Sequence, residues 1–378
     1  MKPHAAAVVA VVCGCTAAGA PPSRPAPHRD ARFEPVVSYL ESQVDSAFPG
    51  AVLAVGHRGD IVLIAAVGRY GQDDRRPVTP ETIYDLASLT KVIGLTTASL
   101  LLAEAGRLDL DAPVQRYVPA FAGAGKERVT VRHLLTHSSG LPAWRPLYTE
   151  TTTRAGAFAL ADSTPLLTPP GDTMVYSDLG AIVLTQVVEG ITGERLDAFL
   201  DRRLFAPLQM TSTRYLPPSS WQPRIAPTER SQDGTIIRGT VHDENAWRLG
   251  GVSGHAGLFS SAPDLARFAT WLLARWRADS GRSITRAFTR RQGLPPGSSR
   301  ALGWDTPSGV SSGGTRLGPN AFGHTGFTGT SIWIDPDRDL FIILLSNRVH
   351  PTRENARILR VRPRVADLVV EALAREAP

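Results

Sequence analysis

Ser88 and Lys91 stand three residues apart in the segment Ala87-Ser88-Leu89-Thr90-Lys91. An apolar run follows at 92–102, which predicts a buried helix that starts at this segment and ends near Gly106. Side chains at positions i and i+3 of a helix share one face, so the Ser88 hydroxyl and the Lys91 amine can touch. The dipole at a helix N-terminus also favours negative charge on the serine oxygen. The pattern indicates a nucleophile beside a base.

The rarity of lysine singles out Lys91. The chain has 41 Lys and Arg residues, of which only Lys2, Lys91 and Lys126 are lysines. Lys2 fits a targeting segment and Lys126 a surface loop, whereas Lys91 lies inside the apolar helix. A lysine can give up its proton and an arginine does not, so Lys91 suits a catalytic role. The alternative is a chance serine beside a lysine that reaches from the helix to solvent, and the short motif alone does not decide.

The length and charge of the chain exclude some functions. Its 378 residues can bury a large core as one big domain or two closely packed ones. The net charge is +6, but arginine is spread along the chain without a basic run or interleaved aromatic residues. This disfavours nucleic-acid binding.

Residues 1–20 have a basic start, an apolar run and then small residues, which predicts a signal peptide. The apolar run is too short to span a bilayer as a mature helix. Val12-Cys13-Gly14-Cys15 resembles a bacterial lipoprotein box, in which Cys15 would be lipidated and become the first mature residue. The alternative is ordinary cleavage after Ala20. We favour lipidation and expect an exported protein, either periplasmic or membrane-anchored, or otherwise secreted. Both cysteines lie in this segment, so the mature domain has no disulfide.

Strand-like runs occur near both ends of the chain, and helical patterns fill the middle. After a linker at 21–32 and an amphipathic helix at 33–48, strands are expected at 51–55, 61–67, 82–86, 322–328, 331–334 and 340–345. Helices are expected at 129–137, from 176 to 188, at 193–205, from 261 onward and at 352–374, with a Gly-rich loop at 250–260. The prediction is an α+β fold. One antiparallel sheet is built from 33–85 plus 321–375 and flanked by terminal helices, and a large, mostly helical region, 86–320, is inserted into it.

Three further stretches accompany the serine motif. Tyr176-Ser177-Asp178 opens a predicted helix, His324-Thr325-Gly326 lies on a predicted strand, and LLTHSSGLP (134–142) lies between the serine and the tyrosine. With these motifs in this order, the chain resembles the penicillin-recognising serine hydrolases, which include class C β-lactamases, low-molecular-mass penicillin-binding D,D-peptidases and family VIII-type esterases. The resemblance covers about residues 33–375 and implies a single β-lactamase/transpeptidase-like catalytic domain.

The resemblance also implies an acyl-enzyme mechanism without cofactor or metal. Ser88 would attack a carbonyl, Lys91 would help to take its proton, and Tyr176 would pass that proton to the leaving group and later activate water. The N–H groups of Ser88 and Phe327 would form the oxyanion hole. Substrate contacts would come from Asp178, His324, Thr325 and Gly326.

His324 departs from the β-lactamase pattern, which usually has lysine at this position. A histidine with an ordinary pKa near 6.5 is largely neutral at about pH 7.5, so affinity for carboxylate-bearing β-lactams should fall. This ranks a D-alanyl peptidase or esterase above an efficient β-lactamase. Arg348, just after the last strand, is a candidate to compensate for the missing charge.

Asp178 is the second departure, because β-lactamases usually have asparagine there. If Asp178 faces Lys91, its carboxylate raises the pKa of the lysine, which then acts more as a cation beside Tyr176 than as a free base. An aspartate would also suit a substrate N–H. The alternative is that Asp178 only caps its helix.

Other readings stay open at this stage. His133 and His137 have a spacing that zinc sites use, but no glutamate lies between them and no third ligand is indicated, so metal binding is disfavoured. The roles of His242 and His255 are undecided. A peptidoglycan-binding protein without turnover is the non-enzyme alternative, although a pure binder needs no base. The sequence does not name the acyl donor, which is a peptidoglycan peptide, an ester or a β-lactam, and does not separate hydrolysis from acyl transfer.

Overall fold

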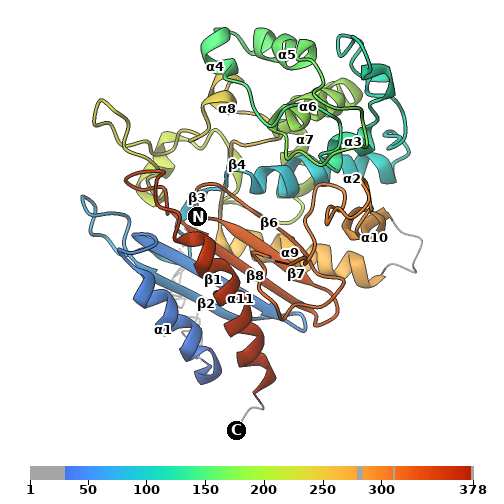
Figure 1. The fold of residues 1–378 in the computed structure, drawn as a ribbon. Coiled ribbons are helices and arrows are strands. Elements are labelled where there is room, and N and C mark those ends of the chain that lie inside the picture. The colour runs from blue at the N-terminus through green and yellow to red at the C-terminus, as the bar shows by residue number, and fades with distance from the viewer. Residues whose placement is uncertain (1–29, 279–283, 310, 376–378) are drawn as a thin grey trace, which may run out of the picture.

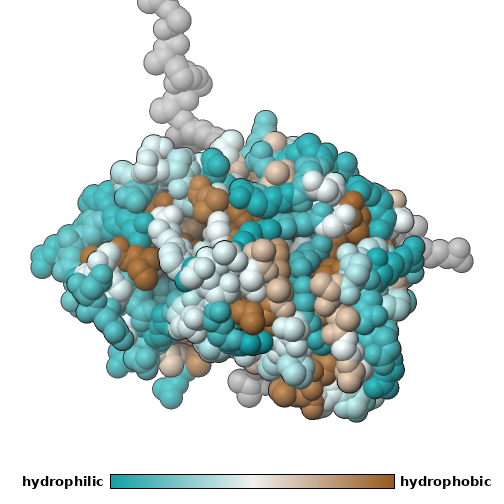
Figure 2. Space-filling model, turned by 90° about the horizontal axis from the view of Figure 1, so that it is seen from above, coloured by the Kyte–Doolittle hydropathy of each residue, from teal (hydrophilic) through white to brown (hydrophobic). Residues whose placement is uncertain are grey.

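The computed structural model describes residues 30–278, 284–309 and 311–375. The predicted signal peptide, Cys15 and most of the linker lie outside these ranges, so their assignments stay predictions. None of the helices in the described ranges is both long and apolar enough to span a membrane. On the face shown in Figure 2, apolar residues occur in small separate groups among hydrophilic ones.

A five-stranded antiparallel sheet joins the two ends of the chain, as predicted (Figure 1). Its strand order is β2-β1-β8-β7-β6, so the β1–β2 hairpin from one end of the chain pairs with the last strand from the other. The strands are β1 (Gly50–His57), β2 (Asp60–Gly68), β6 (Phe322–Thr325), β7 (Ser331–Asp335) and β8 (Leu340–Ser346). Strand β6, at one edge, carries the His324 motif.

Helices cover both faces of this sheet. On one face lie α1 (Glu34–Gln43) and α11 (Ile358–Ala374), and on the other lies α9 (Ala262–Ala278). Side chains alternate between the faces, as a strand requires: Ala51, Leu53 and Val55 join the core under α1 and α11, whereas Val52 and Ala54 join the larger core that continues into the helical region. Burial on both faces explains why β1 reads as a continuous apolar run.

The helical region is built around α6 (Asp178–Thr192), which is buried continuously from Leu179 to Thr185. The segment after Ser88 begins as a π-helical stretch, η2 (Lys91–Thr96), and continues as α2 (Thr97–Glu104), so the predicted buried helix is confirmed. The other helices and helical turns are η1 (Ala31–Phe33), η3 (Val114–Arg116), η4 (Lys126–Arg128), α3 (Val131–Leu135), α4 (Leu147–Glu150), α5 (Arg154–Ser163), α7 (Leu196–Leu200), η5 (Asp201–Phe205), η6 (Ser219–Arg224), α8 (Glu244–Arg248) and α10 (Ile284–Thr289).

A second, three-stranded sheet holds the approach to the serine. Its order is β3 (Ile83–Asp85), β5 (Leu258–Ser261) and β4 (Arg214–Tyr215). The sequence interpretation expected β3 but placed most of β5 in the Gly-rich loop 250–260. The segment is extended because it pairs with β3, from Ile83–Ser261 to Asp85–Phe259, a partner that is distant in the sequence.

Two other expectations are corrected. The strand predicted at 322–328 ends at Thr325, because the chain turns sharply from Gly326 to Thr330. Lys126 does not lie in a surface loop: it is buried, its Nζ donates to the carbonyl oxygen of Asp162, and it lies 4.9 Å from the centre of the Phe121 ring.

Candidate active site

Ser88 follows a tight turn that buried groups hold in place. Ala87 has φ +46°, in the left-handed region that residues with a Cβ rarely adopt. The buried carboxylate of Asp85 accepts the N–H of Ala87 at 2.8 Å and, with its other oxygen, the N–H of His242 at 2.7 Å. The surrounding bonds therefore fix a strained turn, which presents Ser88 between the end of β3 and the start of the buried helix.

Lys91 lies at the centre of the site. Its Nζ is 3.0 Å from Ser88 Oγ, 3.0 Å from the carbonyl oxygen of His255 and 2.7 Å from Asp178 Oδ1. The first two contacts are hydrogen bonds and the third is an ion pair. The side chain is only 3% exposed, so the alternative of a lysine that reaches to solvent is wrong.

The charge of Lys91 is set by its neighbours. Burial alone would lower the pKa of Lys91, but Asp178 and Tyr176 together raise it above its usual value. Lys91 is therefore an ammonium ion at neutral pH, as the sequence predicted for an Asp178 that faces it. The cap of α6 is Ser177, whose Oγ accepts the N–H of Gly180 at 3.1 Å, so capping is not the task of Asp178. Its assignment as a substrate-binding residue stays a prediction.

Tyr176 lies beside two cations. Lys91 Nζ is 4.9 Å and Arg300 Cζ 5.4 Å from the centre of its ring. The rings of His137 and His324 lie 4.5 Å and 5.8 Å from the same centre. Within the described residues the buried Tyr176 hydroxyl makes no hydrogen bond to a protein atom. A phenol oxygen without a partner next to a serine–lysine pair is available to exchange a proton.

The LLTHSSGLP stretch positions the tyrosine segment. His137 Nδ1 accepts the N–H of Ser177 at 3.1 Å, and its carbonyl oxygen accepts the N–H of Val175 at 2.8 Å. Burial, mainly, and nearby cations lower the pKa of His137 well below its usual value. His133 has a separate structural role, because its Nδ1 accepts the N–H of Thr130 at 3.1 Å at the start of α3. Each of the two histidines thus accepts a backbone N–H and orders the segment beside it.

His324 is neutral and presents an acceptor. Its ring is 4% exposed, and burial, with the charges of Arg300 and Lys91, lowers its pKa well below the usual value. Nδ1 lies 2.8 Å from the carbonyl oxygen of Thr325, which can only accept, so Nδ1 carries the proton. Nε2 therefore holds a lone pair, and it has no protein partner among the described residues.

The turn after β6 is tied directly to the turn before Ser88. Thr328 Oγ1 donates to the carbonyl oxygen of Asp85 at 2.6 Å, and Thr330 Oγ1 to that of Leu86 at 2.9 Å. In the described part of the chain, the N–H groups of Ser88 and Phe327 donate to no protein acceptor. Two unused donors on segments locked together are what an oxyanion hole needs.

A cleft of about 540 Å³ opens beside Ser88 and contains four arginines. Three of them are engaged: Arg353 pairs with Glu229 and Glu244, and Arg348 and Arg362 donate to backbone carbonyls. The fourth, Arg300, has no protein partner for its buried Nε and Nη1 within the described ranges. The lining residues are Ser88, Tyr176, Arg300, Asp305, Ser312, His324, Thr325, Gly326, Phe327, Arg348, Arg353, Ala356, Ile358, Leu359 and Arg362.

Arg300 is thus a cation with free donors at this site, and the sequence interpretation missed it. It had named Arg348, whose Nε is 2.7 Å from the Phe327 carbonyl oxygen and whose guanidinium stacks on the Phe327 ring at 4.3 Å. No sequence signal distinguishes Arg300, because it is one of many arginines in a loop without a motif.

His242 and His255 lie around the site without reaching Ser88. His242 Nε2 is 3.0 Å from Glu229 Oε2, and its ring stacks on Phe327 with centres 5.8 Å apart. The buried His255 ring is held by Ser253 Oγ at 2.7 Å and by Asp243 Oδ1 at 2.8 Å, while its carbonyl oxygen accepts from Lys91.

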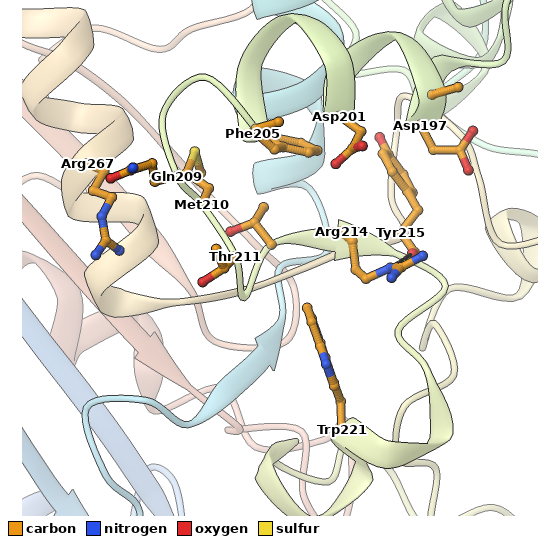
Figure 3. Close-up of a pocket in the computed structure, with 13 residues that line it drawn as sticks. Asp197, Asp201, Phe205, Gln209, Met210, Thr211, Arg214, Tyr215, Trp221 and Arg267 are labelled. Carbon is orange, nitrogen blue, oxygen red and sulfur yellow. Dashed lines mark hydrogen bonds between the residues drawn. The ribbon is translucent and has the colours of Figure 1, made fainter. Parts of the chain in front are cut away.

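A larger cavity, of about 760 Å³, lies at α7, η5 and β4 and is shown in Figure 3. Its walls include Asp197, Arg214, Tyr215 and Trp221. None of the candidate catalytic residues lines it. The chemistry therefore belongs to the smaller cleft at Ser88.

The fold and the site together define a serine hydrolase in which a buried lysine contacts both the serine and a carboxylate. The chain belongs to the Beta-lactamase family, whose model matches residues 36–366. The resemblance inferred from the motifs is confirmed, and so is the expected fold.

Two relatives are similar over most of their length. Over 367 residues the chain is 35% identical to a Bacillus subtilis protein named "N-acetylmuramyl-L-alanine amidase", with 84% of this chain and 81% of the relative aligned. Over 364 residues it is 32% identical to a Salmonella schwarzengrund protein named "Putative D-alanyl-D-alanine carboxypeptidase", with 85% and 83% aligned.

Solved structures agree on the fold. EstCE1, described as a hydrolase with promiscuous acyltransferase activity, superposes with a TM-score of 0.72 at 21% identity over 90% of this chain and 99% of that chain. A class C beta lactamase from Rhodobacter sphaeroides superposes with a TM-score of 0.68 at 24% identity over 92% and 99%. At these identities the comparison supports the fold alone.

Proposed function

We propose that this protein hydrolyses an amide bond in peptidoglycan peptides through an acyl-enzyme on Ser88, with a leaving group that carries a carboxylate. The observation that carries the proposal is the contact of Lys91 Nζ with Ser88 Oγ at 3.0 Å, beside two unused backbone N–H groups. An unpaired cation in the same cleft, Arg300, supports an anionic substrate.

In the first half-reaction Tyr176 acts as its phenolate. Ser88 Oγ forms a bond to the substrate carbonyl carbon, and the hydroxyl proton of Ser88 passes to the phenolate oxygen of Tyr176, which becomes a neutral phenol. The carbonyl oxygen takes the negative charge and accepts the N–H groups of Ser88 and Phe327. Lys91 remains an ammonium ion throughout and stabilises negative charge on the serine and tyrosine oxygens. The C–N bond then breaks as Tyr176 returns the proton to the leaving nitrogen.

In the second half-reaction water attacks the acyl ester. Tyr176 takes a proton from the water, the carbonyl oxygen again occupies the oxyanion hole, and the bond to Ser88 Oγ breaks. Ser88 regains its proton and the free acid leaves. The lone pair on His324 Nε2 accepts a hydrogen bond from a substrate N–H in either step.

The substrate class follows from charge. His324 is neutral, so a lysine-like contact to a β-lactam carboxylate is missing, whereas Arg300, which forms no ion pair among the described residues, supplies positive charge for a carboxylate in the same cleft. A D-alanyl-D-alanine peptide has this carboxylate on its leaving residue, which makes D,D-carboxypeptidase activity the first candidate. A muramyl-L-alanine amide has it too, and the 35% identical amidase favours this second candidate. An efficient β-lactamase ranks lower.

The location of this activity would be outside the cytoplasm. The predicted signal peptide and the lipobox at Cys15 support an exported lipoprotein, which would place the enzyme beside peptidoglycan. Radiolabelled palmitate incorporation into the wild-type chain but not Cys15→Ala would support lipidation. Equal labelling of both would contradict it.

The mechanism is tested by intact-mass labelling with a penicillin and an activated ester, beside release assays. We expect a stoichiometric adduct on the wild type and none on Ser88→Ala. D-alanine release from an acyl-D-Ala-D-Ala peptide and L-alanine release from muramyl-L-alanine separate the two candidates, with nitrocefin and a short-chain ester as references. A wild type that no probe labels and that turns over no substrate would instead support a non-catalytic binder.

A further inference from the structure

Arg362 is a buried cation without a counter-ion. It lies near the start of α11, is 6% exposed, and forms no ion pair among the described residues. Burial and the nearby Arg348 lower the pKa of Arg362 to about 9, which still leaves it charged at neutral pH. A buried charge without a partner is costly, so its position calls for an explanation in function.

Two hydrogen bonds from one nitrogen of the guanidinium hold the turn that follows β6, while the buried Nε has no partner among the described residues. Arg362 Nη2 donates to the carbonyl oxygens of Gly326, at 2.6 Å, and Thr330, at 2.8 Å. These carbonyls open and close the turn that contains Phe327. Arg348 holds the next carbonyl along, that of Phe327, at 2.7 Å. The carbonyl of each peptide group that flanks Phe327 thus accepts a hydrogen bond from an arginine.

The Gly326 carbonyl and the Phe327 N–H belong to the same peptide group. A charged donor on the carbonyl fixes the plane of that group and so the direction of its N–H. It also polarises the amide, which makes the N–H a stronger donor. The Gly326–Phe327 peptide and Arg362 both line the cleft next to Ser88.

We propose that Arg362 is a positioning residue of the oxyanion hole, acting through the Gly326–Phe327 peptide. It rests on the proposed function, because it requires Phe327 N–H to receive the substrate oxygen. The negative charge that develops on that oxygen supplies the counter-charge that Arg362 lacks in the resting protein. The interaction is therefore stronger in the transition state than in the ground state, which is the condition for raising kcat.

A purely structural role predicts different kinetics. If Arg362 only ties α11 to the turn, its loss lowers thermal stability, and any changes in kcat and KM bear no fixed relation to each other. If it supports the oxyanion hole, its loss lowers kcat and the affinity of a boronic acid transition-state analogue together, with KM little changed. The loss of Arg362 would also reduce the preference for an oxoester over the matching thionoester, because a thionoester sulfur is a poor hydrogen-bond acceptor in the oxyanion hole.

The test compares Arg362→Met and Arg362→Lys with Arg360→Met, an exposed arginine on the same helix. We expect Arg362→Met to lose about 100- to 1,000-fold in kcat on an activated ester, comparable to removal of one oxyanion-hole donor. Boronate affinity and the oxoester preference should fall with it. Arg362→Lys, which keeps the charge, should recover part of this loss, and Arg360→Met should match the wild type.

Several results would overturn the proposal. One is an Arg362→Met variant that keeps wild-type kcat and boronate affinity while its melting temperature falls. If that variant does not fold, Arg362→Lys decides, since a wild-type kcat and an unchanged oxoester preference there also contradict the role. Acylation of the wild type is measured first: its absence refutes the proposed function and this inference together, whereas normal acylation with unaffected Arg362 variants refutes the inference alone.

Discussion

Lys91 and Asp178 form an ion pair in which Nζ and Oδ1 lie 2.7 Å apart. The same Nζ also contacts the hydroxyl of Ser88, which precedes Lys91 by three residues. The pair connects the buried helix after Ser88 to the first residue of α6. It keeps Lys91 charged although the side chain is almost fully buried. The site is thus built around a permanent cation, and the proposed mechanism therefore assigns proton transfer to Tyr176.

Replacing Asp178 by asparagine should change the pH dependence of acylation. Without the carboxylate, burial dominates and the pKa of Lys91 falls, so loss of the lysine proton moves down into the range accessible to assay. We expect the alkaline limb of the acylation profile to shift to lower pH. Stopped-flow acylation by an activated ester between pH 6 and 10 measures it.

A matched control for this pair is chemical denaturation over the same pH range. The wild-type lysine, with its raised pKa, contributes its full stability below its unfolded value of about 10.4, whereas Asp178→Asn gains stability as the pH rises through the lowered pKa of its Lys91. The wild-type advantage over Asp178→Asn should therefore be flat at pH values below that pKa and shrink above it. An acylation profile identical to that of the wild type would reduce Asp178 to a structural residue.

Tyr176→Phe tests the proton carrier. The substitution keeps the ring contacts with His137 and Lys91 but removes the hydroxyl. Loss of a positioned general acid–base typically costs about 100- to 10,000-fold, and we expect kcat/KM to fall by that amount with little change in thermal stability. Steady-state ester hydrolysis and a thermal melt measure the two. Activity within threefold of the wild type would assign the proton to another group.

Arg300→Gln tests the recognition of a carboxylate. A hydrogen bond to a charged group contributes about 1.5–3 kcal/mol, so kcat/KM for a peptide with a free C-terminal carboxylate should fall about 10- to 100-fold. The methyl ester of the same peptide lacks the charge and serves as the matched substrate, for which we expect no change. Equal losses on both substrates would show that Arg300 supports Tyr176 rather than the substrate.

Gly326→Ala should separate the two halves of the oxyanion hole. A Cβ at Gly326 would lie 2.3 Å from the Leu86 carbonyl oxygen and 2.2 Å from Thr330 Oγ1, so the turn after β6 must move away from Ser88. We expect kcat to fall more than about 100-fold, as for a lost oxyanion donor. Gly190→Ala, whose Cβ would meet nothing closer than 3.4 Å, is the matched control and should keep wild-type activity.

Glu229→Gln tests the cleft rim by its effect on stability. Burial alone would raise the pKa of Glu229, but the bonds from Arg353 and His242 lower it to about 2. A carboxylate whose pKa is lowered in the folded protein stabilises the fold fully at pH values above its ordinary pKa of 4.5. This contribution is lost as the pH falls through about 2. The wild type should exceed Glu229→Gln in free energy of unfolding by about 1–2 kcal/mol at pH 6, after allowance for solvent screening, and the difference should shrink toward pH 2.

Urea unfolding at several pH values measures this difference. A gap that stays constant from pH 6 to pH 3 would contradict the assigned cause, because it would owe nothing to the ionisation of Glu229. A gap that widens toward acid would have the wrong sign.

The main sheet was predictable because its signals are local. The β1–β2 hairpin and the β7–β8 pair are apolar runs joined by short turns. Only the pairing of β1 with β8 is long-range, and it was inferred from the presence of strands at both ends of the chain. The small sheet was harder. Its strand β5 is four residues long and pairs with β3 and β4 only because distant segments supply the partners.

The serine site shows the same division. Ser88 and Lys91 were predicted to touch because motif spacing and a rare residue type mark them, whereas for Asp178 the sequence left open a contact with Lys91 or a helix cap. Arg300 and Arg362 carry no such mark, since arginine is abundant in the chain and both stand outside the motifs. What distinguishes them is that, among the described residues, neither has a counter-ion although their donor atoms are buried, and that is a property of the three-dimensional arrangement alone.

The hydroxyls of Thr328 and Thr330 bind carbonyls that precede them by 243 and 244 residues in the sequence. Half of the site therefore forms only after segments far downstream of the serine have been synthesised, and α11 with Arg362 comes later still. A nascent or truncated chain would hold its serine in an unfinished setting and could not become acylated. Labelling of Ser88 by an activated ester would then act as a reporter of complete folding, read out at a single residue.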